Sequence, residues 1–325
     1  MFFKDDELGW VMDITMLGPR AVGKTSLLVS LYDQFQTVAG GQLALTPANL
    51  TTRAEMQSYR ESLRAFARGY DHDPGIAGND RIRTHLFGFG TPGRVKPEMT
   101  LRFTDIPGSL LNQTAPDAET AMLDRALRRS GVIFLAVDSP ALMELDGQYN
   151  EETNKPDHVT EFVRDALVRE ANRLIVLVPL KCEKYVATEE GTLELVTRLE
   201  KAYAQLINEA ARRGAAVVIT PVQTVGSMRF SRYAIADGHL HAEFRLARTG
   251  VNTYAPKDND QPVRWMLRYA LNAYRRRPRW FGEMLADWRR GIGPRLDQEL
   301  QRFSLGCKSG DGFKIVVRHD YLAEP

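Results

Sequence analysis

The chain of 325 residues is longer than the roughly 150 residues of a typical single domain, so we expect one enlarged domain or one domain with an appendage. Hydrophobic residues make up 43% of the chain, a share that supports a sizeable core and excludes a disordered or low-complexity protein. The net charge of +2 is close to neutral and does not by itself indicate a nucleic-acid-binding protein.

The chain carries no sign of secretion or of membrane insertion. No apolar run approaches the about 20 residues of a membrane-spanning helix, and the first residues, MFFKDDELGW, are acidic rather than signal-like. Only Cys182 and Cys307 occur, so the sequence implies no disulfide framework and no zinc cluster. We therefore expect a cytoplasmic protein without a transmembrane segment.

A phosphate-binding motif lies near the N-terminus, between a predicted strand and a predicted helix. Residues 18–25 read GPRAVGKT and match the pattern G-x-x-x-x-G-K-[ST]. A β-rich run from Val11 to Leu17 precedes the motif, and apolar residues at helical spacing follow it to about Gln36. This order predicts a nucleoside triphosphate site, because backbone N–H groups of the loop and the helix N-terminus would face the phosphates.

Each residue type of this loop has a chemical task in the predicted site. Gly18 and Gly23 let the backbone curl, and Lys24 would reach the β- and γ-phosphates. The Thr25 hydroxyl would bind Mg²⁺. The backbone N–H groups expected to face the phosphates belong to Ala21, Val22, Gly23, Lys24, Thr25 and Ser26.

A second motif follows a predicted strand, Met99–Thr104, which we expect to pair with an antiparallel strand at Arg81–Phe89. The motif reads Asp105-Ile-Pro-Gly108. A Mg²⁺-holding Asp must sit at such a strand end, and Gly108 would bring its N–H close to a γ-phosphate. The same four residues are also a common turn, and their place downstream of the phosphate loop favours the functional interpretation.

The rest of the chain alternates buried strands with amphipathic helices. Predicted strands cover 131–137, 173–179 and 215–220, and predicted helices cover 52–70, 118–129, 158–171, 192–213 and 263–274. We expect the first of these helices to begin with a capping box from Thr52 to Glu55. The alternation predicts an α/β fold with a mostly parallel sheet covered on both faces, whose ligands bind at the carboxyl ends of the strands.

Four segments in this order, GPRAVGKT, DIPG, LKCE and TPVQTVGS, resemble the motifs of translation-factor/Ras-like P-loop GTPases. The forms PLKCEK and TPVQTVG are most similar to the bacterial double-GTPases, predicted members of multi-gene conflict or defence systems. The resemblance covers residues 9–276, with insertions. It implies a three-layer Ras-like GTPase fold, GTP and GDP as ligands, and Mg²⁺ as cofactor.

The resemblance also implies where the base would bind. Lys181 would pack its stem along the base, and Glu183 would replace the usual Asp that accepts hydrogen bonds from guanine. The loop after the last strand, including Gln223 and Thr224, would donate a backbone N–H to guanine O6. This chain departs from the family in having Leu180 where Asn or Thr is usual. The alternative interpretation of Lys181 and Glu183 is a solvated pair of charges at a strand end.

The sequence leaves the hydrolytic residues open. The resemblance implies a water-orienting Gln directly after D-x-x-G, and this chain has Ser109 there. Arg20, inside the phosphate loop, is either an arginine finger or an exposed side chain. Together with Lys24, these two residues are the catalytic candidates, and we expect hydrolysis that is slow without a partner or dimerisation.

We expect the GTPase domain to span residues 1–276, with insertions at about 37–80 and 228–260. The first insertion lies in the first switch region, and the second is expected to contain a hairpin over 230–246. The Mg²⁺-contacting threonine of the first switch is one of three candidates, Thr46, Thr51 and Thr52.

Residues 277–325 form an Arg- and Trp-rich extension with a predicted terminal strand at 313–318. This extension could bind an acidic partner, anionic lipid or nucleic acid. We favour instead a helix whose Trp and Phe side chains pack on the domain while its Arg side chains face water.

The sequence therefore predicts a cytoplasmic, Mg²⁺-dependent GTPase that hydrolyses GTP to GDP and phosphate and acts as a molecular switch. Its expected partners are a protein effector or an activating protein, with another GTPase among the candidates. One alternative is a non-hydrolysing GTP- or GDP-binding interaction module. The other alternative is an ATPase or phosphotransferase.

Overall fold

The computed structural model describes most of the chain. The described residues are 2–5, 7–68, 76, 81–94, 96–111, 117–169, 172–236, 239–246, 254–276 and 282–324, and for a few of these only the backbone is described.

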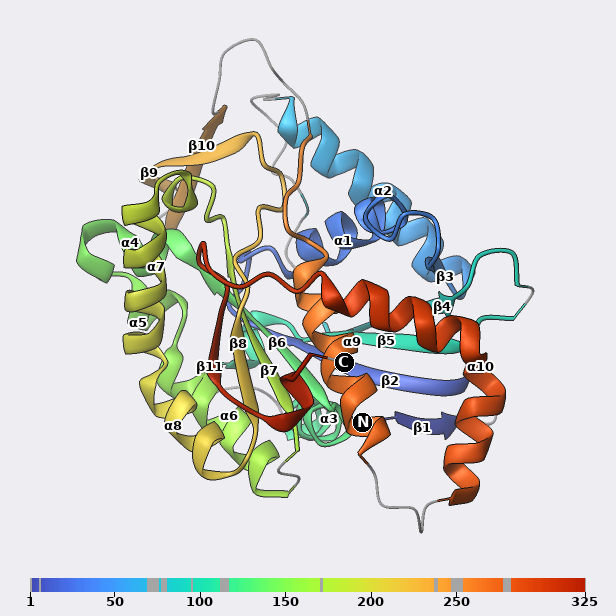
Figure 1. Cartoon of the computed structure of the whole chain (residues 1–325). Helices are drawn as coiled ribbons and strands as arrows, with labels where there is room; N and C mark the ends of the chain where they lie inside the picture. Colours follow the sequence, from blue (N-terminus) through green and yellow to red (C-terminus); the bar gives the residue numbers. More distant parts are fainter. Residues whose placement is uncertain are drawn as a thin grey trace.

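A nine-stranded sheet forms the centre of the molecule (Figure 1). Its strands are β1 Phe2–Asp5, β2 Gly9–Leu17, β3 Ala44–Pro47, β4 Arg83–Gly90, β5 Met99–Asp105, β6 Val132–Asp138, β7 Leu174–Leu180, β8 Ala216–Ile219 and β11 Lys314–Val317. They lie in the order β11-β8-β7-β6-β2-β5-β4-β3, with β1 paired to β2. The neighbours from β8 to β5 are parallel, and β1, β3, β4 and β11 pair antiparallel. The predicted mostly parallel sheet is confirmed.

Helices cover both faces of the sheet, which makes the fold a three-layer α/β structure. Their bounds are α1 Lys24–Val38, α2 Leu50–Ala67, α3 Asp117–Arg129, α4 Ser139–Met143, α5 Asn150–Thr153, α6 Pro156–Arg169, α7 Glu189–Ala202, α8 Ala204–Arg212, α9 Gln261–Arg275 and α10 Gly282–Leu305. One hydrophobic cluster joins the sheet to α1, α2, α9 and α10, and a second joins it to α3, α6, α7 and α8. None of the helices in the described part is long and apolar enough to span a membrane.

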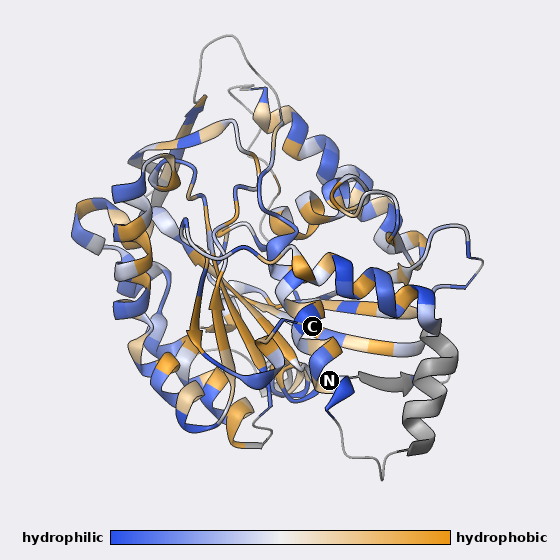
Figure 2. Ribbon diagram, in the orientation of Figure 1, coloured by the Kyte–Doolittle hydropathy of each residue, from blue (hydrophilic) through white to orange (hydrophobic). Residues whose placement is uncertain are grey.

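The continuous apolar strands predicted from the sequence are buried on both faces. In β6, Val132 and Phe134 belong to the first cluster, and Ile133 and Leu135 belong to the second. Successive side chains of a strand point to opposite faces, so a strand between two helix layers needs apolar residues at every position. Figure 2 shows the same pattern as hydrophobic central strands under helices with hydrophilic outer surfaces.

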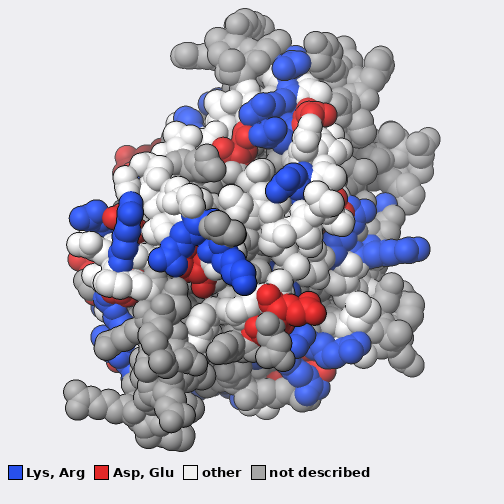
Figure 3. Space-filling model, turned by 90° about the vertical axis from the view of Figure 1, so that its right-hand side faces the viewer, with Lys and Arg blue, Asp and Glu red and all other residues white. Residues whose placement is uncertain are grey.

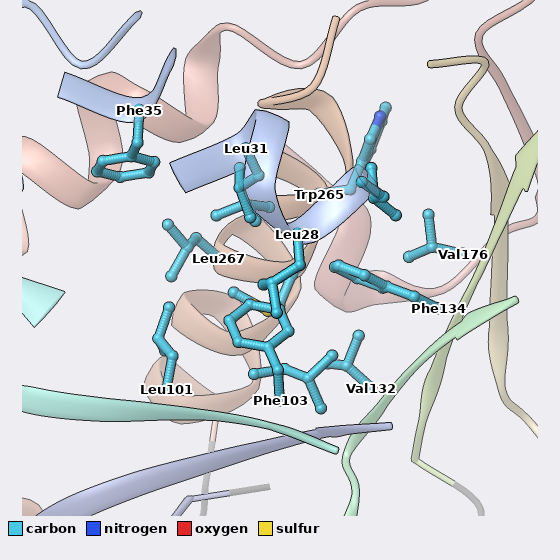
Figure 4. Packing of buried hydrophobic residues seen from close by; sticks show 14 of the residues in the cluster. Leu28, Leu31, Phe35, Leu101, Phe103, Val132, Phe134, Val176, Trp265 and Leu267 are labelled. Carbon is cyan, nitrogen blue, oxygen red and sulfur yellow. The ribbon is translucent and has the colours of Figure 1, made fainter. Parts of the chain in front are cut away.

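The helix that follows the phosphate loop is held on the sheet by this first cluster. Leu28 and Leu31 of α1 lie near Phe103 of β5, and Trp265 and Leu267 of α9 approach from the neighbouring helix (Figure 4). All five side chains are at most 2% exposed. Burial of this kind stabilises by about 1.5–3 kcal/mol per large apolar side chain, so the start of α1 is firmly placed against the strand ends.

The predicted capping box of the second helix is wrong. Helix α2 begins at Leu50, and Asn49 is its N-cap, because the Asn49 side chain accepts the Thr52 backbone N–H at 2.7 Å. The Thr52 hydroxyl instead accepts the backbone N–H of Leu86 in β4 at 3.2 Å. The Thr52 hydroxyl therefore bonds to a neighbouring strand, although local sequence rules predict that it caps the helix.

The helix predicted over 192–213 is interrupted. Helix α7 ends at Ala202 and α8 begins at Ala204, because Tyr203 has non-helical backbone angles (φ −105°, ψ 20°). The Tyr203 side chain is fully buried in the second hydrophobic cluster. The predicted antiparallel pair β4–β5 and the hairpin are confirmed, the latter as β9 Met228–Ala236 and β10 His239–Leu246.

The C-terminal part of the chain lies on α9. Arg264 and Arg268 of α9 donate hydrogen bonds to the backbone carbonyls of Phe303 and Ser304 at the end of α10. Leu296, Leu300 and Phe303 of α10 are buried in the first cluster. The predicted terminal strand is confirmed as β11, which pairs antiparallel with β8.

Basic side chains of this region take part in ion pairs. Arg275 and Arg276 lie 3.1 Å from Asp297 and 2.8 Å from Asp320. On the face shown in Figure 3, Lys and Arg side chains lie interspersed with Asp and Glu. Residues 277–281 and the side chains from 282 to 292, where the extension was expected to pack its Trp residues, lie outside the described part, so the boundary at 276 stays a prediction.

Candidate nucleotide-binding site

The phosphate loop joins the end of β2 to the start of α1. Gly18, Ala21 and Gly23 have positive φ angles of 144°, 58° and 107°. A Cβ atom at Gly18 would lie 2.5 Å from the Ala136 carbonyl oxygen, so this position requires glycine. Ala21 holds a left-handed conformation that costs an L-residue roughly 1–2 kcal/mol, and such backbone strain gathers at ligand sites.

Lys24 lies inside the loop that precedes it. Its ammonium donates to the carbonyl oxygens of Gly18 at 2.9 Å and Pro19 at 3.0 Å, and the side chain is only 6% exposed. Burial lowers the pKa of Lys24, and the nearby Asp105 carboxylate opposes that shift. An anionic ligand at this loop would compensate the buried charge.

Thr25 and Asp105 meet beside the loop. The Thr25 hydroxyl donates to Asp105 Oδ2 at 2.9 Å, and Asp105 Oδ1 is buried without a hydrogen-bond partner in the structure. Burial raises the pKa of Asp105, while Lys24 and the Thr25 hydroxyl lower it. An uncompensated carboxylate oxygen next to a threonine hydroxyl fits Mg²⁺, which prefers oxygen ligands. The described residues contain no group of three or more His, Cys, Asp or Glu side chains that could hold a metal ion, so a metal here would need phosphate and water oxygens as further ligands.

Gly108 brings the D-x-x-G turn into contact with the phosphate loop. A Cβ atom at Gly108 would lie 2.1 Å from the Arg20 backbone nitrogen and 2.4 Å from the Pro19 carbonyl carbon. The position therefore requires glycine because of close approach. Arg20 and Ser109 are both exposed beside this contact. Two other polar residues near the motif, at 112 and 113, lie outside the described part.

Lys181 pairs with an aspartate that the sequence did not single out. Its ammonium lies 2.6 Å from Asp138 Oδ2, and Asp138 Oδ1 accepts the Ala141 backbone N–H and so caps α4. Asp138 is the last residue of β6, just as Asp105 is the last residue of β5. Its place at the end of a predicted strand could have marked Asp138 as a candidate site residue. The alternative of a solvated Lys181–Glu183 pair is wrong, because Glu183 is buried and Lys181 binds Asp138.

Glu183 connects the LKCE segment to the loop after β8. Its Oε1 accepts the Gly226 backbone N–H at 3.3 Å. Burial raises the pKa of Glu183, and hydrogen bonds from its own backbone N–H and from those of Gly226 and Val225 oppose the shift. Gly226 has φ 76°, and a Cβ atom there would lie 1.8 Å from the Ala255 carbonyl oxygen. The carboxylate therefore stabilises the loop that was expected to contact the base.

The loop after β8 is supported by a segment that sequence analysis missed. Gln223 and Lys257 exchange two backbone hydrogen bonds, of 3.1 Å and 2.9 Å. The Gln223 N–H is therefore directed at Lys257 rather than at a ligand, and Thr224 is buried next to it. No motif marks the segment around Lys257, because pairing through backbone atoms requires no particular side chain.

The switch threonines bind the neighbouring strand. The Thr46 hydroxyl donates to the Gly88 carbonyl oxygen at 3.3 Å, and the Thr52 hydroxyl accepts the Leu86 N–H. Thr51 is exposed on the first turn of α2. In this structure the two bonded hydroxyls connect β3 and α2 to β4 rather than contacting the Thr25–Asp105 pair.

A charged cluster from α2 and β4 adjoins Asp105. Arg83 is the cross-strand partner of Asp105 and donates a hydrogen bond to the Tyr59 hydroxyl. His85 is fully buried, with Nδ1 at 3.2 Å from Glu55 Oε2. Burial raises the pKa of Asp105, and the Arg83 charge is among the smaller effects that oppose this shift. This cluster depends on cross-strand register, so sequence spacing gave no signal for it.

Comparison with known proteins assigns the chain to a family. No curated protein matches the chain. The sequence model of the family described as Double-GTPase 2 matches residues 13–227, more than half of the chain. The matched region contains the phosphate loop, the D-x-x-G turn, the LKCE segment and the loop after β8. The chain therefore belongs to the Double-GTPase 2 family.

Proposed function

We propose that the protein binds GTP and GDP with Mg²⁺ and hydrolyses GTP to GDP and phosphate as a nucleotide-controlled switch. The observation that carries the proposal is the contact geometry at the sheet edge. There the Thr25 hydroxyl donates to Asp105, whose second oxygen is buried without a partner, next to a buried lysine in a phosphate loop. Membership of a GTPase family supports GTP as the triphosphate.

At the phosphate end, the chain would act mainly by binding and positioning. Lys24 would turn from its own loop carbonyls toward the β- and γ-phosphates, assisted by the N–H groups from Ala21 to Ser26. Thr25 and Asp105 would hold Mg²⁺, and the bound ion would neutralise part of the phosphate charge. Gly108 touches the phosphate loop, so a γ-phosphate that attracts its N–H would also shift the turn that follows.

At the base end, Glu183 favours guanine. Guanine offers N1–H and a 2-amino group as donors, whereas adenine presents N1 as an acceptor to the carboxylate. A buried charged acceptor that is left unpaired costs more than the about 1 kcal/mol of a neutral hydrogen bond. The site is therefore expected to discriminate against ATP.

Hydrolysis by the isolated protein is expected to be slow. Ser109 stands where the family resemblance implies a water-orienting Gln, and its short hydroxyl is poorly suited to orient a water. An activating partner or a second GTPase would then supply the missing group. The same observation favours a second candidate function, a GTP- or GDP-binding interaction module that does not hydrolyse. We place either function in the cytoplasm, in a bacterial multi-gene conflict or defence system.

Competition binding combined with phosphate release tests the proposal. With Mg²⁺ present, GTP should bind at least about 100-fold more tightly than ATP, which corresponds to about 2.7 kcal/mol. Lys24→Ala should abolish tight triphosphate binding, and Thr25→Asn should weaken GTP binding more than GDP binding. Equal competition by ATP and GTP would refute the guanine site. Tight GTP binding without phosphate release, with and without partner proteins, would select the non-hydrolysing module.

A further inference from the structure

The hairpin of β9 and β10 lies at the base end of the candidate site. In Figure 1 it stands beyond the ends of the central strands, on the side of α4 and α7. The Lys181 ammonium lies 5.7 Å from the ring centroid of Phe244 in β10. Lys184 lies similarly over Phe230 of β9, at 5.5 Å. Both lysines flank Glu183, so the hairpin presents aromatic rings to the segment expected to recognise the base.

A register shift places Phe244 opposite another aromatic residue. Glu243 pairs with Arg232, but the next residue, Phe244, pairs with Phe230, so that Ser231 has no cross-strand partner. Such bulges re-aim side chains and occur near functional sites. Here the bulge brings the two Phe rings to 6.2 Å in an edge-to-face contact.

Phe244 also touches the other insertion. Its ring lies 6.2 Å from that of Phe66 in α2, again edge to face. On the other side, Phe230 contacts Tyr233 at 4.9 Å, and Tyr233 contacts Tyr149 at 4.9 Å. A continuous row of aromatic rings therefore runs from α2 across the hairpin to the segment before α5. Edge-to-face contacts of this kind stabilise beyond burial alone, so the row holds Phe244 in place.

We propose that Phe244 is a base-binding residue that forms one wall of the base site, opposite the stem of Lys181. The ligand it takes is the planar ring system of a purine, whose faces are apolar and whose edge would meet Glu183. The supporting contact from Phe66 ties this wall to α2, which carries Glu55 and Tyr59 of the cluster beside Asp105. The inference rests on the proposed function, because it assumes a nucleotide on the phosphate loop.

The test compares a nucleotide with a ligand that has phosphates but no base. In the full chain, Phe244→Leu should weaken GDP binding roughly tenfold to a hundredfold, the range for losing an aromatic stack on a base. Binding of Mg²⁺-tripolyphosphate should stay at the parent level. Phe230→Leu removes the other edge-to-face partner of Phe244 and should give an intermediate loss of GDP binding. The control is Ser231→Ala, a change at an exposed position of the same hairpin, which should leave GDP binding at the parent level. Phe66→Leu should give an intermediate loss for GDP alone.

Parent-level GDP binding by Phe244→Leu would overturn the inference, and so would an equal loss of GDP and tripolyphosphate binding. A second variant covers the case in which Phe244→Leu does not fold. Phe244→Trp should show fluorescence quenching by GDP but not by tripolyphosphate, measured against the parent with its own tryptophans, and an unchanged signal would also overturn the inference. If the parent binds ATP as well as GTP, the guanine proposal fails, whereas this test still runs with either nucleotide.

Discussion

At the scale of single residues, two buried carboxylates mark the two ends of the candidate site. Asp105 is 1% exposed and Glu183 is 6% exposed, and burial raises the pKa of both. Asp105 has one oxygen without a hydrogen-bond partner, whereas Glu183 already accepts a backbone N–H from Gly226. The first therefore has one oxygen that could bind a metal, whereas the second would have to accept hydrogen bonds from both its loop and a base.

Base selectivity should follow the chemistry of residue 183. Glu183→Asn should shift preference from guanine toward xanthine nucleotides, because the new amide donates to the 2-oxo group of xanthine. Competition among GTP, xanthosine triphosphate and ATP measures the shift. Glu183→Asp is the control, because it shortens the side chain as Asn does but keeps the carboxylate that accepts from guanine. Selectivity that does not change in Glu183→Asn would show that LKCE is not the base site.

The hydrolytic residues can be ranked by single-turnover kinetics. Ser109→Ala should change the rate by less than about tenfold, because removing a poorly placed hydroxyl leaves the positioning of water to other groups. Arg20→Ala should reduce the rate more if Arg20 stabilises charge in the transition state, where an arginine finger contributes about 10³–10⁵. Arg53→Ala, on the exposed side of α2, is the control for losing a surface arginine. The reverse ranking would assign the water-positioning role to Ser109.

At the scale of elements, helix α2 shows how a tertiary contact changes a helix start. Asn49 caps the helix, and Thr52 binds β4 through Leu86. The helix thereby enters the structure with its first turn fixed to the strand that pairs with β5. Glu55 and Tyr59, one and two turns further on, consequently face the cluster beside Asp105.

This capping geometry predicts a stability difference. Asn49→Ala should lower the free energy of unfolding by about 1 kcal/mol, the usual cost of losing an N-cap side chain. Thr51→Ala, an exposed change in the same turn, should have little effect. Urea denaturation of both variants measures the difference. Equal stability of Asn49→Ala and Thr51→Ala would mean that the cap contributes nothing to the fold.

At the scale of the whole molecule, the order of the parallel strands gathers the motifs. Strands β2, β5, β6 and β7 are neighbours, and the phosphate loop, Asp105, Asp138 and Lys181 follow their carboxyl ends. Parallel strands place their carboxyl ends at one edge of the sheet. Segments that are far apart in the chain therefore lie at one site, because the sheet itself brings the strand ends together.

Stability of the whole fold should depend on pH through His85. The side chain is fully buried, and burial lowers its pKa below the ordinary value near 6.5, with the Glu55 charge opposing. Below about pH 6.5 the unfolded chain therefore takes up a proton that the folded chain does not. The free energy of unfolding should fall as the pH drops through 6.5 toward the lowered folded pKa, and this contribution should be constant above that range.

Denaturation of the parent and of His85→Gln at pH 7.5 and at pH 5.5 measures this effect. The parent should lose more stability on acidification than the variant, by up to about 1.4 kcal/mol for each unit by which the pKa is lowered. Tyr59→Phe is a control that alters the same cluster without removing a group that titrates near neutral pH. An identical loss in the parent and in His85→Gln would exclude His85 as the source.

The sequence by itself determined the features that depend on neighbours along the chain. The strand, glycine loop and helix around Lys24 were predictable, because hydrophobic period and glycine chemistry are local properties. The buried strands were equally clear, since a strand between two helix layers is apolar at every position. These patterns led to the fold class and to the family.

Only the tertiary structure decided the features that depend on contacts between distant residues. Lys181 pairs with Asp138, 43 residues away, and Gln223 pairs through its backbone with Lys257. Phe244 lies 5.7 Å from the Lys181 ammonium although the two residues are far apart in the chain, and a register shift in the hairpin sets its cross-strand partner. The physical reason is the same in each case. A side chain contacts the partner that burial and strand register bring within a few ångströms. Neither burial nor register can be predicted from the residue spacing within one segment.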